Sequence, residues 1–555
     1  MVITRIGSIW IACHLFVLAA EGQSFAEPPP SKPAEPYFAG LGNHTRKVST
    51  ESATAQRYFD QGLAFLYAFN HDEAIRSFKA AAACDPNCAM ARWGIALANG
   101  PHVNNPGVDG THAQAAWEAL TRAQMLAAKA TPVEAKLIGA LAKRYAQPQP
   151  KDRKPLDEAY GQAMRKVWES HPDDADIGAL TAEALIDLRP WDQWTLDGKA
   201  QPGTDEVLRI LDTVLAKSPQ HPLALHLFIH AVEASSHPER AEAAADRLRD
   251  LEPGLGHLVH MPSHIDVRLG HWQQAILANQ KAIAADKAYR QTVPNQGFYR
   301  LYMAHNHHLL AYAAMMQGQS KQAMEAIREM FAGIPEEFSK QNAPMMDPFV
   351  ALPFELQMRF GQWDALLAEP KPRGCFPITT AMWHFARGVA LAAKVNPDQA
   401  KAEQSAFLAA VNAVPKEAVS GKNAAHDVLG VAEKMLAGEI LYREGKSEEA
   451  FEALREAVRR EDKLHYIEPP DWILPVRHAL GAALMDAGRY AEAEAIYQED
   501  LARHPENGWS LYGLARSLRT QGKPEAAAAA ARFEKAWQHA DVKLSSSCFC
   551  LQGKE

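Results

Sequence analysis

The stretch QRYFDQGLAFLYAFNHDEAIRSFKAAAACDP, residues Gln56 to Pro86, decides the fold. Its two apolar segments flank a polar turn, Asn70-His71-Asp72-Glu73. Gly62 precedes this turn, and Ala74 and Phe78 follow it, four residues apart on one helical face. The stretch therefore predicts a pair of amphipathic helices joined by a tight turn and closed by a proline.

The same kind of turn, a small residue followed by polar residues and then alanine, recurs along the chain. It is found at Ser236 to Ala241, Gly270 to Ala275, Gly318 to Ala323, Gly445 to Ala450, Gly488 to Ala493 and Gly522 to Ala527. The turns at Ser236 and Gly270 are 34 residues apart, as are those at Gly488 and Gly522. One helix pair cannot bury its own apolar face, so this period predicts stacked pairs around a continuous core.

These residues resemble the tetratricopeptide repeat family, whose pattern combines a small residue, a turn, an Ala-x3-Phe segment and a terminal proline. Pro253 and Pro505 fall where Pro86 does. The resemblance covers most of Gln56 to Ala540 and is weakest over Asn99 to Gln220. It implies an all-α fold, an α-solenoid built as a right-handed superhelix of helix-turn-helix repeats, with insertions between some repeats.

Three turn-to-turn spacings exceed 34 residues; one is the 43 residues from Gly318 to Gly361, and the inserts in the other two can be located. The turns at Gly270 and Gly318 are 48 residues apart, and those at Gly445 and Gly488 are 43 apart. The surplus falls near Tyr289 to Met303 and near Lys463 to Ile473, in both cases between one repeat and the next. Both inserts are therefore expected on one edge of the superhelix, as lids over the groove or as solvent-exposed loops.

The ends of the chain and the repeats predict the domain organisation. Residues 1–26 have the features of a cleaved export signal, so the protein is expected to be periplasmic or secreted. No other apolar run is long enough for a membrane anchor. We expect an extended linker over 27–54, N-terminal repeats over 55–220, central repeats over 221–346, C-terminal repeats over 347–540 and a cysteine-containing tail over 541–555.

Composition and motifs exclude several classes of function. The 555 residues include 66 acidic and 58 basic side chains, a net charge of -8. This balance leaves no basic surplus for neutralising phosphates, so nucleic acid is not an expected partner. Phosphate-binding glycine loops, the Gly-x-Ser-x-Gly elbow and the His-Glu-x-x-His motif are all missing, so nucleotide, serine-hydrolase and zinc-protease chemistry lack support. Nothing in the composition indicates an oligomeric state.

The histidines are concentrated in the central repeats. Eleven of the 23 lie between His221 and His308, where an even spread would place about four. Counted back from the turns, His226 and His230 stand at the same positions as the pair His260 and His264, ten and six residues before. His308 and Tyr312 repeat these positions before Gly318, His257 and His305 stand thirteen before their turns, and Glu233 stands three before its own.

This register predicts a metal site. The family resemblance implies that these first-helix positions face the concave groove. Histidines four residues apart lie about 6 Å apart on one helical face and can chelate one ion. Imidazole suits copper, zinc, iron and nickel, and we favour copper, with zinc or iron as alternatives. The predicted ligands are His226, His230, His257, His260, His264, His305 and His308.

Two further residues are candidates for catalytic roles. Glu233 is a ligand, a general base or the group that fixes the tautomer of an imidazole. Tyr312 is a candidate for positioning a substrate or handling a proton. Pro262 interrupts the helix that carries His260 and His264, and it predicts a kink or a late helix start between them.

Three functions fit this pattern. The first is an exported, oxygen-using copper oxidoreductase with a polyhistidine, two-metal centre that acts on a small molecule in the groove. Its ligand pattern is similar to that of the paired-copper sites of the tyrosinase and haemocyanin class, by ligand type and not by fold. The second is a repeat scaffold that binds a peptide or protein partner without catalysis. The third is metal storage or delivery.

The remaining candidates are weaker. Cys84 and Cys88 could form a local disulfide, whereas Cys548 and Cys550 could bind a soft metal. His384 and His478 reach the groove only if the superhelix curls back on itself. His44 and His102 lie in predicted loops without an evident partner.

Overall fold

The computed structural model describes residues 35–551, which form 27 α-helices, three short 3-10 helices and one two-stranded hairpin. The predicted all-α fold is confirmed. The predicted export signal, residues 1–26, lies outside the described residues. None of the described helices combines the length and the hydrophobicity needed to cross a membrane.

The elements follow one another as helix pairs. The N-terminal part contains α1 (Ala53–Tyr67), α2 (His71–Cys84), α3 (Ala89–Ala98), α4 (Gly110–Leu126), η1 (Ala127–Lys129), α5 (Pro132–Leu141), α6 (Lys154–Ser170), α7 (Ala175–Ile186) and α8 (Thr204–Lys217). The central part contains α9 (Pro222–Val232), η2 (Pro238–Ala241), α10 (Glu242–Leu248), α11 (Gly256–His260), α12 (Pro262–Leu269), α13 (Trp272–Thr292), η3 (Gly297–Tyr299), α14 (Arg300–Met316), α15 (Ser320–Ala332) and α16 (Glu336–Gln341).

The C-terminal part continues in the same way. It contains α17 (Ala343–Val350), α18 (Leu352–Arg359), α19 (Trp363–Ala368), α20 (Pro377–Ala393), α21 (Pro397–Ala413), β1 (Val419–Ser420), β2 (Asn423–Ala424), α22 (Ala425–Arg443), α23 (Ser447–Glu461), α24 (Val476–Asp486), α25 (Tyr490–Arg503), α26 (Gly508–Thr520) and α27 (Ala526–Ala536). β1 and β2 form an antiparallel hairpin.

The predicted turns separate the helices of each pair. The turn at Asn70 joins α1 to α2, and the Asn70 side chain accepts a hydrogen bond from the Glu73 backbone at the start of α2. Gly270, Gly318, Gly445, Gly488 and Gly522 all have positive φ, between 69° and 79°. Glycine adopts this left-handed conformation without a steric penalty, which is why it recurs where one helix ends and the next begins.

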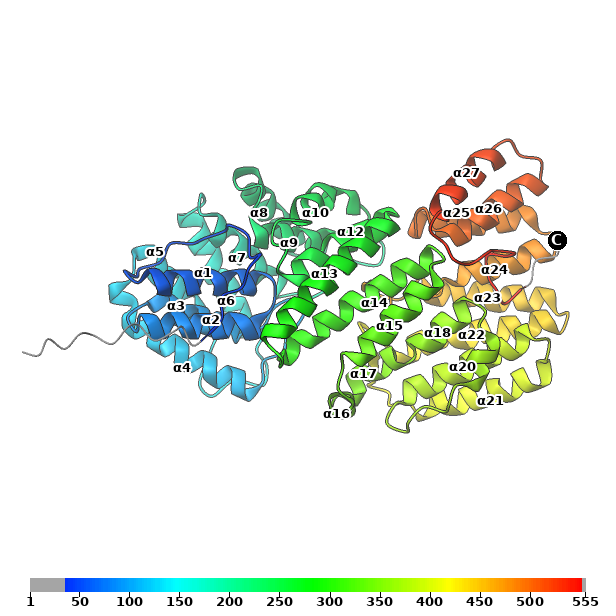
Figure 1. Ribbon diagram of the computed structural model, residues 1–555, viewed down its shortest axis with the longest axis horizontal. Coiled ribbons are helices and arrows are strands. Elements are labelled where there is room, and N and C mark those ends of the chain that lie inside the picture. Colours follow the sequence, from blue (N-terminus) through cyan, green and yellow to red (C-terminus); the bar gives the residue numbers. More distant parts are fainter. Residues whose placement is uncertain (1–34, 552–555) are drawn as a thin grey trace, which may run out of the picture.

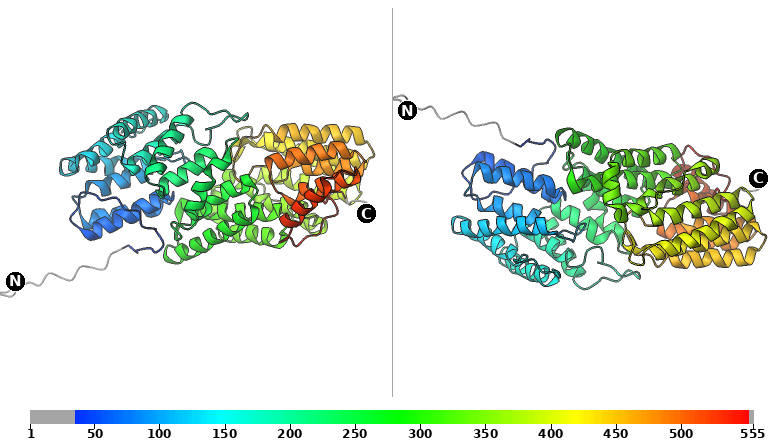
Figure 2. Two further views of the ribbon diagram at one scale, coloured as in Figure 1. Left: turned by 90° about the horizontal axis from the view of Figure 1, so that it is seen from above. Right: turned by 90° about the horizontal axis from the view of Figure 1, so that it is seen from below.

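The helices form an elongated molecule with two apolar cores (Figures 1 and 2). One core belongs to the N-terminal half, and the other runs through the C-terminal half. α13 and α14 lie where the two halves meet (Figure 1). Among the histidine-rich helices, α12 and α14 contribute residues to both cores, whereas α9 and α11 belong to the N-terminal core and contact them.

Long-range contacts hold the ends of the chain to the central helices. Tyr289, near the first insert, donates a hydrogen bond of 2.9 Å to Glu73 in α2. At the other end, the indole of Trp272 donates to the Pro505 carbonyl at 2.9 Å, and the indole of Trp509 donates to the Met315 carbonyl at 3.0 Å. The C-terminal repeats thus fold back onto the central ones.

The Phe78 ring packs against two glycines. A Cβ atom at Gly94 would lie 2.7 Å from carbons of this ring, and one at Gly62 would lie 2.6 Å from them. Gly139 in α5 is also helical, but nothing lies within 4 Å of the corresponding position. The first repeat therefore depends on close helix packing at Gly62 and Gly94.

We expect Gly94→Ala to destabilise the protein by about 1–3 kcal/mol, because the added methyl group overpacks a well-filled core. Gly139→Ala is the matched control, and it should be neutral or stabilising by up to about 1 kcal/mol, since alanine is the better helix former. Denaturant midpoints of the two variants measure the difference. Equal midpoints would contradict this account of the packing.

Candidate metal centre

Six of the seven predicted histidine ligands form two adjacent triads. One triad consists of His226, His230 and His257, and the other of His260, His264 and His305. Within each triad, one ring nitrogen from each histidine lies within 4.8 Å of the others. Five of the six are buried, and His305 is partly buried. These are ligand sets that can each hold one ion.

The triads are built from four helices at the junction of the two halves. α9 carries His226 and His230 one turn apart, α11 carries His257 and His260, α12 carries His264, and α14 carries His305. Pro222 lies in the first turn of α9, and the His221 side chain accepts a hydrogen bond from the Ala224 backbone there. This start fixes the register that turns His226 and His230 toward α11.

The two triads lie next to each other. The ring centres of His230 and His264 are 5.8 Å apart, and those of His257 and His260 are 5.7 Å apart. Distances within the triads are similar, for example 4.7 Å between His260 and His305. The geometry is therefore that of two neighbouring three-histidine sites.

The predicted break at Pro262 is confirmed. α11 ends at His260, and α12 begins at Pro262, where the missing proline N–H needs no helical acceptor. His260 and His264 lie on either side of the break, yet their Nε2 atoms approach to 2.7 Å. This is a hydrogen-bond distance, so without a metal one of the two Nε2 atoms carries a proton, and an ion bound by both histidines would take the place of that proton.

One carboxylate orients a histidine of each triad. Glu233 accepts a hydrogen bond of 2.8 Å from Nδ1 of His230, and its other oxygen accepts from Nδ1 of His264. An ionised carboxylate only accepts, so Nδ1 carries a proton in both rings, and Nε2 is the nitrogen that can bind an ion. Glu233 therefore fixes the tautomer that ligation requires.

Two further acceptors do the same for other ligands. The Tyr67 carbonyl oxygen lies 2.8 Å from Nδ1 of His226, and Asn279 Oδ1 lies 2.7 Å from Nδ1 of His260. The Asn279 amide nitrogen donates to the Ala275 carbonyl at 2.8 Å, which keeps Oδ1 toward the imidazole. Four of the six histidines thus have a hydrogen-bond acceptor at Nδ1, so that Nε2 is the nitrogen available to a metal ion.

The ligand atoms of the first triad lack partners. Among the described residues, Nε2 of His226, Nε2 of His230 and both nitrogens of His257 are buried without a hydrogen bond. Leaving one buried polar atom unpaired costs about 1–3 kcal/mol, and native proteins contain few such atoms. Their convergence in one cluster fits residues that hold a metal ion.

Burial keeps five of the six triad histidines neutral. It lowers the pKa of most of these imidazoles below the ordinary value, so they are uncharged at neutral pH; this holds for His226, His230, His257, His260 and His305. Burial also acts to lower the pKa of His264, but the charge and hydrogen bond of Glu233 raise it. The Glu233 carboxyl responds in the opposite sense: burial would raise its pKa, but His264 and His230 bring it down to about 2.

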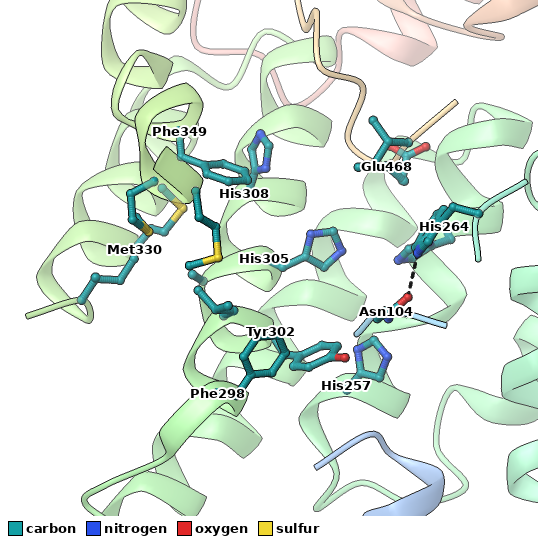
Figure 3. A pocket seen from close by; sticks show the side chains of 17 residues that line it. Asn104, His257, His264, Phe298, Tyr302, His305, His308, Met330, Phe349 and Glu468 are labelled. Carbon is teal, nitrogen blue, oxygen red and sulfur yellow. Dashed lines mark hydrogen bonds between the residues drawn. The ribbon is translucent and has the colours of Figure 1, made fainter. Parts of the chain in front are cut away.

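A cavity of about 310 Å³ lies beside the triads (Figure 3). His257, His264 and His305 face into it, together with His308 and Glu468. Most of the remaining wall is apolar: Trp191, Phe298, Leu301, Tyr302, Ala304, Met330, Ile334, Met345, Met346, Phe349 and Ile467. A small molecule in this cavity would contact ligands from both triads.

Both predicted inserts contribute to the cavity wall. The first brings Phe298 and Tyr302, and the second brings Ile467 and Glu468. The second insert also reaches the carboxylate behind the triads, because the Tyr466 hydroxyl lies 3.4 Å from Glu233 Oε2 and 3.1 Å from Glu468 Oε2. Of the two expectations for the inserts, walls over the groove fit better than solvent-exposed loops.

Two predicted site residues lie outside the triads. His308 is one turn beyond His305 and lines the cavity, with its ring 5.6 Å from that of Phe349. Tyr312 lies two turns beyond His305, about 10 Å along the helix. The structure places it in the apolar core, with its ring 5.8 Å from that of Trp272, and its suggested catalytic role stays a prediction.

Several residues around the triads were not predicted. Phe69 lies against His226, with ring centres 4.3 Å apart, and Trp191 meets the His230 ring edge to face. The Trp191 indole donates a hydrogen bond of 3.0 Å to Asn104. Trp191 belongs to the Trp-Asp-Gln-Trp segment that interrupts the repeat pattern, so this interruption was the available signal.

The weaker candidates have structural roles. Nε2 of His478 contacts Asp500 at 2.9 Å, and Nδ1 of His384 contacts Glu403 at 2.7 Å; neither lines the cavity. Cys548 and Cys550 form a disulfide, whereas Cys84 and Cys88 are separate thiols. His102 packs against Phe69, with ring centres 4.5 Å apart.

A third group of possible ligands, His44, Asp176 and His221, is already satisfied. Oδ1 of Asp176 lies 2.8 Å from Nε2 of His44 and 3.1 Å from Nε2 of His221, and it accepts from the Tyr67 hydroxyl at 2.6 Å. Its Oδ2 accepts from the Arg46 guanidinium at 3.0 Å. A cation here would meet the charge of Arg46, so we interpret this group as a structural network.

Comparison with known proteins identifies the repeats at both ends of the chain. Residues 59–99 and 484–532 match sequence profiles described as tetratricopeptide repeats. The chain contains tetratricopeptide repeats. The first match covers α2 and α3, with part of α1, and the second covers α25 and α26, with parts of α24 and α27.

Solved tetratricopeptide-like structures resemble the chain only distantly. The Cut9-Hcn1 hetero-tetramer of APC/C matches at 14% identity and a TM-score of 0.30, over 84% of this chain and 76% of that one. A human IFIT1 dimer with m7Gppp-AAAA matches at 14% identity and 0.32, over 89% and 91%. Yeast Tom70 matches at 12% identity and 0.28, over 87% and 93%. No curated protein sequence matches the chain.

Proposed function

We propose that the protein binds a pair of transition-metal ions, one in each histidine triad, within a tetratricopeptide repeat solenoid. The observation that carries this proposal is the orientation of the imidazoles. Four of the six have Nδ1 bonded to a carbonyl or carboxylate oxygen, so Nε2 is left for a metal. Hydrogen-bonded acceptors behind ligating histidines are typical of metal sites.

We further propose that the centre is catalytic, in an exported oxidoreductase. Three protein ligands leave a coordination position open, and three of the six histidines also line the cavity. Copper is favoured, because an all-imidazole set suits it and offers no carboxylate ligand, with zinc or iron as alternatives. A bound copper pair would supply electrons for chemistry with dioxygen on a small molecule.

A second function is supported by the repeats themselves. Tetratricopeptide repeats commonly present a surface to a peptide or protein partner. The cavity of about 310 Å³ has room for a small molecule rather than a peptide segment, so such a partner would bind another face of the solenoid. Partner binding, without catalysis, is therefore compatible with the buried centre. Metal storage or delivery is a third function that uses the same ligands.

Metal analysis of protein purified without a histidine tag tests the first proposal. We expect about two equivalents of a transition metal, or uptake of two equivalents when the metal-free protein is titrated. Less than half an equivalent, combined with no uptake on titration, would leave the scaffold function alone. Oxygen consumption with phenols or thiols then separates an enzyme, which consumes oxygen repeatedly, from a storage protein, which does not.

A further inference from the structure

Two polar atoms in the cavity are not explained by the metal centre. Oε1 of Glu468 and Nε2 of His308 are buried and lack hydrogen-bond partners within residues 35–551. The two residues are only 6% and 8% exposed, and both line the cavity. Figure 3 shows Glu468 on the side of His264, across the cavity from His305 and His308. These atoms are available to a polar group on a bound molecule.

The position of Glu468 is fixed by its second oxygen. The Tyr466 hydroxyl lies 3.1 Å from Oε2 and donates to it, which leaves Oε1 as the free acceptor. The Tyr466 ring in turn lies beside the Arg268 guanidinium, 5.2 Å from ring centre to Cζ. Glu468 is therefore held as an acceptor for one hydrogen-bond donor.

The rest of the cavity is suited to an aromatic ring. Phe298, Tyr302 and Phe349 line it, and aromatic rings favour edge-to-face and offset contacts with one another. Phe298 and Met345 are 41% and 39% exposed, so they form an apolar mouth. Apolar cavities of about 150 Å³ bind benzene. The cavity here, at about 310 Å³, has room for one or two rings.

We propose that this cavity binds a one- or two-ring aromatic molecule whose single hydroxyl group donates a hydrogen bond to Oε1 of Glu468, with His308 on the opposite wall. Such a molecule would be the substrate of the metal pair, and this role rests on the proposed function. Binding itself needs only the side chains of the cavity. The ring would lie next to His257 of the first triad and next to His264 and His305 of the second.

Isothermal titration of the full-length, metal-free protein with benzyl alcohol and benzyl methyl ether tests this inference. The two probes differ only in the replacement of the donor hydrogen by a methyl group. Burial raises the pKa of the Glu468 carboxyl to about 7, so the titration is done at about pH 8.5, where the group is ionised. There we expect the alcohol to bind about ten- to a hundredfold more tightly, as one hydrogen bond to a charged acceptor provides. Glu468→Leu should remove this preference. Phe349→Ala should weaken both probes by a similar factor.

Glu355→Leu is the matched control, because Glu355 is also buried but lines only the adjoining pocket. It should keep the preference for the alcohol. If Glu468→Leu does not fold, Glu468→Gln replaces it and should weaken the alcohol while leaving the ether unchanged. Equal affinities for the two probes, binding of neither, or a preference that survives both Glu468 substitutions would overturn the inference.

The metal content of the same preparations separates the two proposals. Protein that prefers the alcohol but takes up no metal would contradict the proposed metal function alone. Protein that takes up two equivalents but does not distinguish the probes would contradict the substrate class alone.

Discussion

Replacing His226 and His257 together by alanine should remove one of two metal equivalents and leave the other. Each triad supplies three imidazoles, and the loss of two leaves a single ligand, which cannot retain an ion against dialysis. The double replacement of His260 and His305 should likewise remove one equivalent. All four replacements together should remove both. Elemental analysis of the dialysed proteins measures the result.

His237→Ala is the control for this series. His237 also lies in the histidine-rich part of the chain, but its side chain is 69% exposed in a turn. Its replacement should leave both equivalents, and all variants should keep their helical content by circular dichroism. If each double variant loses all of its metal, the two triads form one mixed site. If neither loses any, the ligands lie elsewhere.

Glu233→Gln should weaken metal binding about ten- to a hundredfold, the range found when such supporting groups are lost. The two Glu233 oxygens accept from His230 and His264. A glutamine has one acceptor oxygen, and its amide nitrogen would face the protonated Nδ1 of the other ring, donor against donor. One imidazole of one triad therefore loses its orientation. Competition with a chelator of known affinity measures the effect.

Glu252→Gln is the matched substitution. Glu252 is 1% exposed, and burial raises the pKa of its carboxyl to about 8, so at neutral pH the group is largely uncharged, as glutamine is. We expect its metal affinity to equal that of the wild type. An unchanged affinity in Glu233→Gln as well would show that Glu233 does not orient the ligands.

The fold could be predicted where local signals repeat. The turns at Asn70, Gly270, Gly318, Gly445, Gly488 and Gly522 all join helices as expected, because a glycine or asparagine there acts on its own neighbours. The return of the C-terminal repeats could not be predicted in this way. It depends on contacts such as Trp272 to Pro505, whose partners are 233 residues apart.

In the site, too, the residues set by local periodicity could be predicted, and those that depend on long-range contacts could not. Six of the seven predicted ligands meet, because helical periodicity carries their register from one repeat to the next. Tyr312 shares a register position with His230 and His264 but lies two turns past His305, in the apolar core, and its role stays a prediction. The groups behind the ligands, the Tyr67 carbonyl and Asn279, come from other helices and carry no sequence signal.

The arrangement of carboxyl groups bears on the oxidation state of a bound metal. Imidazoles that bind a metal are neutral and contribute no charge, and Glu233 is the one carboxylate hydrogen-bonded to the triads in the described part of the chain. Glu468 adds a second carboxyl group at the cavity; burial raises its pKa to about 7, and a cation bound nearby would favour its ionised form. Two monovalent ions would be balanced by these two groups, whereas two divalent ions would leave an excess of buried positive charge, which is unfavourable. The reduced form of a copper pair would therefore be electrically balanced by the protein alone, and the oxidised form would require a small anion from solvent.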